Sequence, residues 1–294
     1  MSDNAAAETT VMGEAEWRER QRAHADRVRP WIEPRLARRQ RGERHPVDDF
    51  LFEYYSFRPA QLARWHPGLG VTLTGDVRPW ASVRGYVVDE QGARVDETAI
   101  DHRAIRDIAV LLRRTGERPA ALGCFGRHEW AMVYHRAQDD IRHSGWPLRL
   151  PPEAIAEVVE SAPLRCTHFD AFRFYAPDAI PLNVVRPSRA TQADHEQPGC
   201  LHASMDLYKW AYRSYPVVGA DLTADLFALA REVRAVDMRA APYDLSALGY
   251  APLRIETPDG RAEFIALQRD FARRGQEQRR RLLGALEAAA SVPA

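Results

Sequence analysis

The segment LHASMDLYKWAYR, residues 201–213, constrains the fold of this chain more than any other stretch. If the segment is helical, apolar side chains cover most of the circumference of the helix. A helix of that kind is normally buried, because it cannot turn its apolar surface away from water on its own. We therefore predict a buried helix at 201–213.

The same helix carries one polar stripe. Its members recur at intervals of four, three and four residues, which places them on one helix face: His202, Asp206, Lys209 and Arg213. Lys209 is the only lysine among 41 lysines and arginines, and lysine differs from arginine where a compact or reactive amine is needed. We expect the stripe to face a cleft, with His202, Asp206 and Lys209 as candidate catalytic residues. An internal salt bridge between helices explains the pattern equally well.

The remaining sequence predicts an α+β fold that is predominantly helical, with a small antiparallel sheet. Alternating or β-branched residues at 71–77 and 84–97, around a turn at Glu90–Gly92, indicate short strands. Apolar residues recur at helical spacing in further segments, near 47–55, 101–115, 150–162, 222–239 and 261–290.

Three regions follow from the distribution of charged and apolar residues. Residues 1–13 bury too little apolar surface to fold, which predicts a disordered tail. Residues 14–44 predict a charged helical arm, which Pro30 and Pro34 would break into pieces. Residues 45–294 predict a single, mainly helical globular domain.

The formal net charge is zero, so no overall electrostatic field attracts the chain to nucleic acid or to an anionic membrane. Binding to DNA would need a local basic patch. No apolar run approaches the roughly 18 residues of a membrane span, and the first residues lack the apolar stretch of a secretory signal. We expect a cytoplasmic protein without membrane contact, whose oligomeric state the sequence leaves open.

Each of the three cysteines is followed within four residues by a histidine. The paired CxxC and HxxxH spacings of structural zinc sites are absent, which disfavours a thiolate site. A looser set of imidazoles and carboxylates is a candidate site for a divalent metal. This set comprises His128, Glu129, His168, Asp170, His202 and Asp206.

The segment THFDAFRF, residues 167–174, alternates in part and predicts a buried strand. His168 and Asp170 would then share one face of the strand, and a polar pair beside phenylalanines is typical of the wall of a site. A buried hydrogen bond between the two side chains is the alternative interpretation.

Four longer stretches lie within residues 45–270: HPVDDFLFEYYSFRP, GCFGRHEWAMVY, THFDAFRFY and EQPGCLHASMDLYKWAY. Together they resemble a family of bacterial proteins usually labelled 3-methyladenine DNA glycosylase. The resemblance implies a DNA-repair N-glycosylase, a hydrolase that releases alkylated purines from DNA in base excision and needs no cofactor. The Gly-rich hairpin of well-characterised helix-hairpin-helix glycosylases has its nearest counterpart in HPGLG, which VTLTGD follows in place of a helix.

A glycosylase extrudes its target base, stacks it on aromatic rings and places a carboxylate near the sugar. The candidate catalytic residues are therefore Glu129, Asp170, His202, Asp206 and Lys209. The candidate substrate-binding residues are Trp130, Tyr208, Trp210 and Arg213. A basic patch for the phosphates would come from the last predicted helix, with Arg269, Arg273, Arg274, Arg279, Arg280 and Arg281.

The alternative function is a metal-dependent enzyme that acts on a small molecule. Its ligands would come from His128, Glu129, His168, His202 and Asp206, whose side chains suit a divalent ion. The sequence does not decide between the two functions.

Overall fold

A computed structural model describes residues 9–290 of the protein. Within these residues most of the chain is helical and four short strands form one sheet, so the predicted mainly helical α+β class is confirmed. No helix in this part of the chain combines the length and the apolar character that crossing a bilayer demands.

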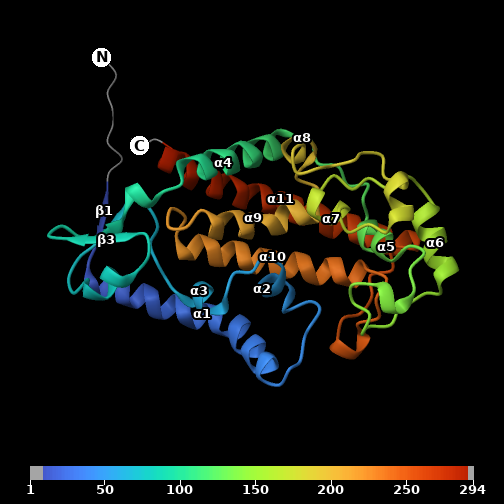
Figure 1. The fold of residues 1–294 in the computed structure, drawn as a ribbon, viewed down its shortest axis with the longest axis horizontal. Coiled ribbons are helices and arrows are strands. Elements are labelled where there is room, and N and C mark those ends of the chain that lie inside the picture. Colours follow the sequence, from blue (N-terminus) through green and yellow to red (C-terminus); the bar gives the residue numbers. More distant parts are fainter. Residues whose placement is uncertain (1–8, 291–294) are drawn as a thin grey trace, which may run out of the picture. The chain divides into compact units, whose positions relative to one another are not determined.

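Figure 1 shows the elements in chain order. The helices are α1 (Glu14–Gln40), α2 (Phe50–Tyr54), α3 (Pro59–Ala63), α4 (His102–Glu117), α5 (Arg127–Val133), α6 (Pro152–Glu160), α7 (Phe169–Phe172), α8 (Gln192–His195), α9 (Leu201–Arg213), α10 (Ala220–Ala240) and α11 (Pro258–Ala290). The strands are β1 (Thr10–Met12), β2 (Val71–Leu73), β3 (Tyr86–Asp89) and β4 (Gly92–Val95).

The chain divides into two compact units. The first unit comprises Met1–Val110, Leu207–Ala228 and Gln278–Ala294, and the second comprises Leu111–Asp206 and Leu229–Glu277. The boundaries between the units fall inside α4, α9, α10 and α11. This division does not test whether either unit folds alone, so the predicted single domain at 45–294 stays a prediction.

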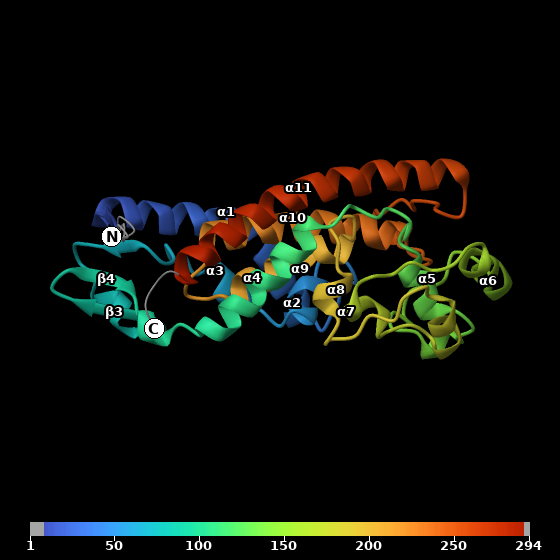
Figure 2. The ribbon, with the colours of Figure 1, turned by 90° about the horizontal axis from the view of Figure 1, so that it is seen from above.

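The sheet of the first unit has the strand order β1-β2-β4-β3, and Figure 2 labels its neighbouring strands β3 and β4. The predicted hairpin is confirmed, because β3 and β4 pair antiparallel with Tyr86 opposite Val95. The expectation of a purely antiparallel sheet is wrong, since β1 pairs parallel to β2. The pattern of residues 71–97 indicates only the strands of that segment, whereas β1 comes from the N-terminal segment and adds to the edge of β2 opposite β4.

The predicted disordered tail at 1–13 is wrong for Thr10–Met12, which forms β1. The backbone N–H of Thr10 donates to the Gly70 carbonyl at 2.9 Å, and the Thr74 N–H donates to the Met12 carbonyl at 2.9 Å. Met12 is also buried. Composition missed this strand because its hydrogen-bond partners lie about sixty residues away. The remainder of the predicted tail, residues 1–8, lies outside the described residues.

The predicted arm at 14–44 is one helix, α1, which continues through Pro30 and Pro34. Each proline removes a backbone donor and costs roughly 3 kcal/mol inside a helix. Burial of Trp17, Val28 and Ile32 along the helix opposes that cost, at about 1.5–3 kcal/mol for each large apolar side chain. The break predicted from the prolines is therefore absent.

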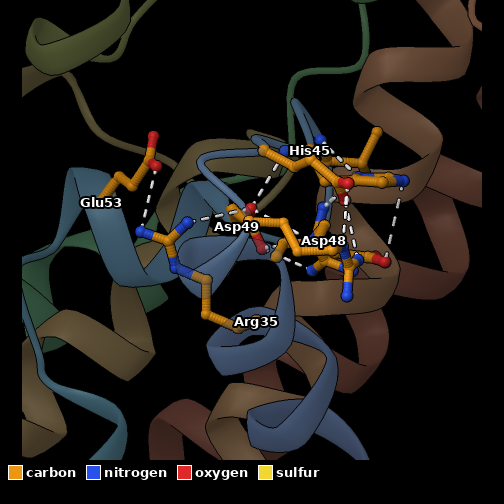
Figure 3. A network of polar contacts seen from close by, with 9 residues as sticks. Arg35, His45, Asp48, Asp49 and Glu53 are labelled. Carbon is orange, nitrogen blue, oxygen red and sulfur yellow. Dashed lines mark hydrogen bonds and ion pairs between the residues drawn. The ribbon is translucent and has the colours of Figure 1, made fainter.

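Asp49 anchors the turn before α2 to the last part of α1 (Figure 3). Its side chain is completely buried and forms ion pairs with Arg35 at 3.0 Å and with Arg38. Arg35 also reaches Glu53 at 3.1 Å, and the His45 backbone N–H donates to Asp49 Oδ2 at 3.0 Å. A buried carboxylate requires such partners, so this network holds the two segments in place.

The second unit contains α5, α6, α7 and α8. The predicted strand at 167–174 is wrong, because residues Phe169–Phe172 form the short helix α7. Its backbone is satisfied locally: the Phe172 N–H donates to the His168 carbonyl and the Arg173 N–H to the Phe169 carbonyl, each at 3.0 Å. The alternating pattern therefore does not place His168 and Asp170 on a common strand face.

Candidate metal centre

Helix α9 covers Leu201–Arg213, the range that the sequence predicts, and its residues from Leu201 to Lys209 are all buried. The Gln197 side chain fixes the backbone just before this helix, since its Oε1 accepts hydrogen bonds from the backbone N–H groups of Gly199 at 2.7 Å and Ala121 at 2.8 Å. The first half of α9 thus carries His202 and Asp206 into the interior of the second unit.

The first ligand group comprises His128 from α5, His202 from α9 and Asp237 from α10. One potential ligand atom from each residue lies within 4.8 Å of the other two. His128 Nε2 and Asp237 Oδ1 are 3.0 Å apart, and the rings of His128 and His202 lie 4.6 Å apart between centroids. All three side chains are buried. Two imidazoles and one carboxylate therefore converge without bulk water.

The second ligand group comprises His168, Glu196 and Asp206, and its ligand atoms also lie within 4.8 Å of one another. His168 Nε2 is 3.2 Å from Asp206 Oδ2 and 3.3 Å from Glu196 Oε1. His168 immediately precedes α7, Glu196 follows α8, and all three residues are buried. One imidazole therefore faces two carboxylates.

His202 links the two ligand groups. Its ring stacks on that of His168, with centroids 5.2 Å apart and an angle of 24° between the planes. On the far side of the first group, the buried Arg234 guanidinium donates to Asp237 Oδ2 and to Glu129 Oε1, each at 3.1 Å. Arg234 therefore fixes the orientation of Asp237 and partly balances the negative charge.

The three residues of the first ligand group have strongly shifted pKa values. Burial opposes the charge of His128, but the Asp237 carboxylate raises the pKa of His128 well above its usual value. Burial likewise opposes the charge of Asp237, whereas His128 holds the pKa of that carboxyl well below its usual range. Burial and the nearby His128 lower the pKa of His202 well below 6.5. His202 is therefore neutral, as a metal ligand must be.

A small cavity adjoins the first ligand group, and His128 and His202 line it together with Cys124, Cys166 and Cys200. Its volume is ≈ 10 Å³, about the room that one water molecule needs. Burial raises the pKa of the Cys166 thiol to about 11, so this thiol is neutral. Within residues 9–290, neither ligand group includes a cysteine.

The structure brings most of the predicted metal ligands together. His128, His168, His202 and Asp206 belong to the two groups, and Glu129 adjoins them through Arg234. Asp170 belongs to neither group, and its carboxylate pairs with Arg173 at 3.1 Å.

The predicted stacking residue Trp130 is completely buried in the second unit. Its Nε1 donates to the Ala240 carbonyl at 2.8 Å, and the Arg149 guanidinium lies 5.5 Å from the ring centroid. In this conformation Trp130 acts as a core residue, and a base cannot reach its ring.

The other predicted binding residues belong to the first unit. Tyr208 is completely buried, and its ring packs edge-on against Phe227 with centroids 4.9 Å apart. The buried Lys209 ammonium lies 4.3 Å from the ring centroid of Trp210, which is half-buried. Arg213 is exposed.

Sequence reasoning missed Glu196, Asp237 and Arg234. Asp237 carries a signal, because it continues the completely buried helical stripe of Ala230 and Val233 at intervals of three and four residues. A carboxylate on such a face needs a buried partner. Glu196 lies in a polar loop, where no periodic pattern distinguishes it from exposed acids.

Comparison with known protein families, with curated proteins and with solved structures gave no match. The two ligand groups and their surroundings are therefore the basis for a functional proposal.

Proposed function

We propose that the protein is a metal-dependent enzyme, which binds transition-metal ions at the two ligand groups and acts on a small molecule. The observation that carries the proposal is the convergence of three imidazoles and three carboxylates in the interior of one unit. Imidazole and carboxylate together suit Fe²⁺, Mn²⁺ or Zn²⁺, whereas Mg²⁺ and Ca²⁺ favour sites built from oxygen alone.

The imidazole–carboxylate distances in each group fit a shared ion. Metal bonds to imidazole nitrogen and carboxylate oxygen are about 2.0–2.2 Å long, which places two ligands of one ion about 2.9–3.5 Å apart at angles near 90–110°. The His–carboxylate distances of 3.0 Å in the first group and of 3.2 and 3.3 Å in the second fall in this interval. An ion would thus replace the proton between each of these imidazole–carboxylate pairs, and His202, whose ligand atom lies within 4.8 Å of the other two ligand atoms of the first group, would move closer to complete it.

Charge also favours cations. Glu129, Glu196, Asp206 and Asp237 are buried in the same unit, and Arg234 pairs with Glu129 and Asp237. Buried carboxylates are stable only when paired or bound to metal.

The first group provides the chemistry expected of an open metal site. Two histidines and one carboxylate occupy three positions of an ion and leave the others for exogenous ligands, as in non-haem iron enzymes. The water-sized cavity beside His128 and His202 gives such a ligand room. A bound ion would act there as a Lewis acid toward a small ligand such as water.

The DNA glycosylase expectation stays a prediction. Stacking of a base would require Trp130 or Tyr208 to leave the core. On α11, Arg273 pairs with Asp270 at 2.7 Å and Arg274 with Glu232 at 2.7 Å, which reduces the charge available for phosphates. The metal centre is the function that the observed geometry favours.

The test is a titration of chelated, metal-free protein with Fe²⁺ under anaerobic conditions, and with Mn²⁺ and Zn²⁺, by isothermal titration calorimetry. We expect at least one of these ions to bind with a stoichiometry of one to two per chain, and His202→Ala to abolish binding at the first group. His135→Ala is the matched control, because His135 also lies beside a carboxylate, at 3.4 Å from Asp178, but on the surface. Absence of binding by the unaltered protein, or equal loss in both variants, would contradict the proposal.

A further inference from the structure

The first unit contains a cavity that the metal centre does not involve. It is lined by α3 and the residues on both sides of it, by the end of α9 and by the segments around Arg84 and Tyr215, with a volume of ≈ 480 Å³. That volume lies in the range of roughly 300–1,000 Å³ that is typical of small-molecule sites. All of its lining residues belong to the first unit.

The cavity is positively charged. Arg64, Arg84 and Arg213 line it, and among the residues that the structure describes no Asp or Glu does so. None of the carboxylates in residues 9–290 forms an ion pair with these arginines. Burial raises the pKa of Tyr215, and the positive charges of Arg64 and Arg84 oppose that rise. Both guanidinium groups therefore interact electrostatically with the Tyr215 hydroxyl. The charge around the cavity suits an anion.

Aromatic rings form another part of the wall. Phe57 and Tyr212 stack with centroids 4.7 Å apart and planes at 20°, and the Tyr212 hydroxyl donates to the Tyr55 carbonyl. The Tyr215 hydroxyl donates to the Arg84 carbonyl at 2.5 Å. These contacts fix the rings before any ligand arrives, which lowers the entropy lost on binding. Aromatic side chains in the wall favour a planar, unsaturated ligand.

The backbone at the cavity is also unusual. Ser56 lines the cavity with φ of 57°, in the left-handed region that residues with a side chain rarely adopt. Such conformations cost about 1–3 kcal/mol and are concentrated at ligand sites. The conformation of Ser56 directs the chain from α2 into Phe57, the residue that stacks on Tyr212.

We propose that this cavity binds a small phosphate monoester that carries a planar ring, of the kind represented by a nucleoside monophosphate. Arg64, Arg84 and Arg213 bind the phosphate, because guanidinium groups pair with its oxygens in bidentate geometry and their combined charge matches a dianion better than a carboxylate. The ring lies against Phe57 and Tyr212. The inference is independent of the metal centre, since the lining residues belong to the other unit.

The experiment is isothermal titration calorimetry of the full-length protein with AMP, adenosine, inorganic phosphate, benzoate and a single-stranded oligonucleotide. We expect AMP to bind at one site per chain, at least about tenfold more tightly than adenosine, phosphate or benzoate. Of these ligands only AMP combines a phosphate for the arginines with a base for the aromatic rings. Arg84→Gln and Tyr212→Leu should each weaken AMP binding by about tenfold or more. Arg44→Gln, at an exposed arginine of the same unit outside the lining, should leave it unchanged.

Several results would overturn the inference. They are no binding of AMP, binding of AMP no tighter than that of phosphate or adenosine, tighter binding of benzoate, and AMP binding that Arg84→Gln leaves intact. Binding of the oligonucleotide without binding of AMP would also overturn it, and would favour a nucleic-acid site on this face. Melting curves of each variant confirm that the folded state persists at the temperature of the titration.

Discussion

His66 gives the first unit a dependence of stability on pH that can be calculated. The side chain is only 7% exposed, and Tyr86 Oη lies 3.3 Å from Nδ1. Burial, with the nearby charges of His24 and Arg64, lowers the pKa of His66 from 6.5 to about 3. The folded protein therefore holds a neutral imidazole that the unfolded chain protonates below pH 6.5.

A histidine whose pKa is lower in the folded state stabilises that state only while it stays neutral. This contribution is complete above pH 6.5 and is lost as the pH falls towards 3. Each pH unit in that interval changes the free energy of unfolding by about 1.4 kcal/mol. Between pH 7.5 and pH 4.5 the imidazole of His66 should therefore remove about 2–3 kcal/mol of stability.

The measurement compares urea denaturation of the unaltered protein and of His66→Gln at both pH values, with chelator present to exclude metal binding. Glutamine is neutral at either pH and keeps a polar group near Tyr86, so the fall in stability should shrink by about 2–3 kcal/mol. Other buried histidines, such as His143, contribute equally to both proteins and cancel in the comparison. His135→Gln, at an exposed position, serves as the control. An equal fall in the unaltered protein and in His66→Gln would refute the reasoning.

Three further predictions concern stability. Asp49→Ala should lower the free energy of unfolding, measured by urea denaturation, by about 3–5 kcal/mol, because it leaves Arg35 and Arg38 without their buried carboxylate. Substitution of the half-buried neighbour, Asp48→Ala, should lower it by about 1 kcal/mol or less. Removal of bound metal by a chelator should lower the melting temperature, since an ion at a thousand times its Kd stabilises the folded state by about 4 kcal/mol; an unchanged melting temperature would count against the metal centre. Lys209→Met should lower the free energy of unfolding by about 1–2 kcal/mol, because the ammonium over the Trp210 ring is lost, and should leave the metal content unchanged. Loss of metal from this variant would instead connect Lys209 to the metal centre.

The parts of the fold that the sequence predicts are those that local patterns determine. Helix α9 begins and ends where its apolar periodicity predicts, because burial on nearly all sides leaves the segment no other stable arrangement. The hairpin of β3 and β4 follows from the alternating residues on both sides of the turn at Glu90–Gly92, which is also a local pattern. By contrast, β1 depends on β2, from a distant part of the chain, so composition could not reveal it.

The candidate site divides in a similar way. His128, His168, His202 and Asp206 stand out because polar side chains interrupt apolar segments at these positions. Glu196 has no periodic signal, and Asp237 stands out only as a carboxylate on an apolar helical stripe; the packing of α9 and α10 in the second unit decides which acids face the histidines. Asp170 was named from a strand pattern that the local hydrogen bonds of α7 override.

Metal content is the measurement that tests the central claim most directly. Purified, tag-free protein would be analysed for transition metals by mass spectrometry, both as isolated and after incubation with Fe²⁺, Mn²⁺ and Zn²⁺ followed by removal of unbound ions. The account predicts one to two ions per chain in the unaltered protein and a clear loss in a His202→Ala and Asp206→Ala double variant that remains folded. A folded, unaltered protein that retains no transition metal under any of these conditions would contradict it.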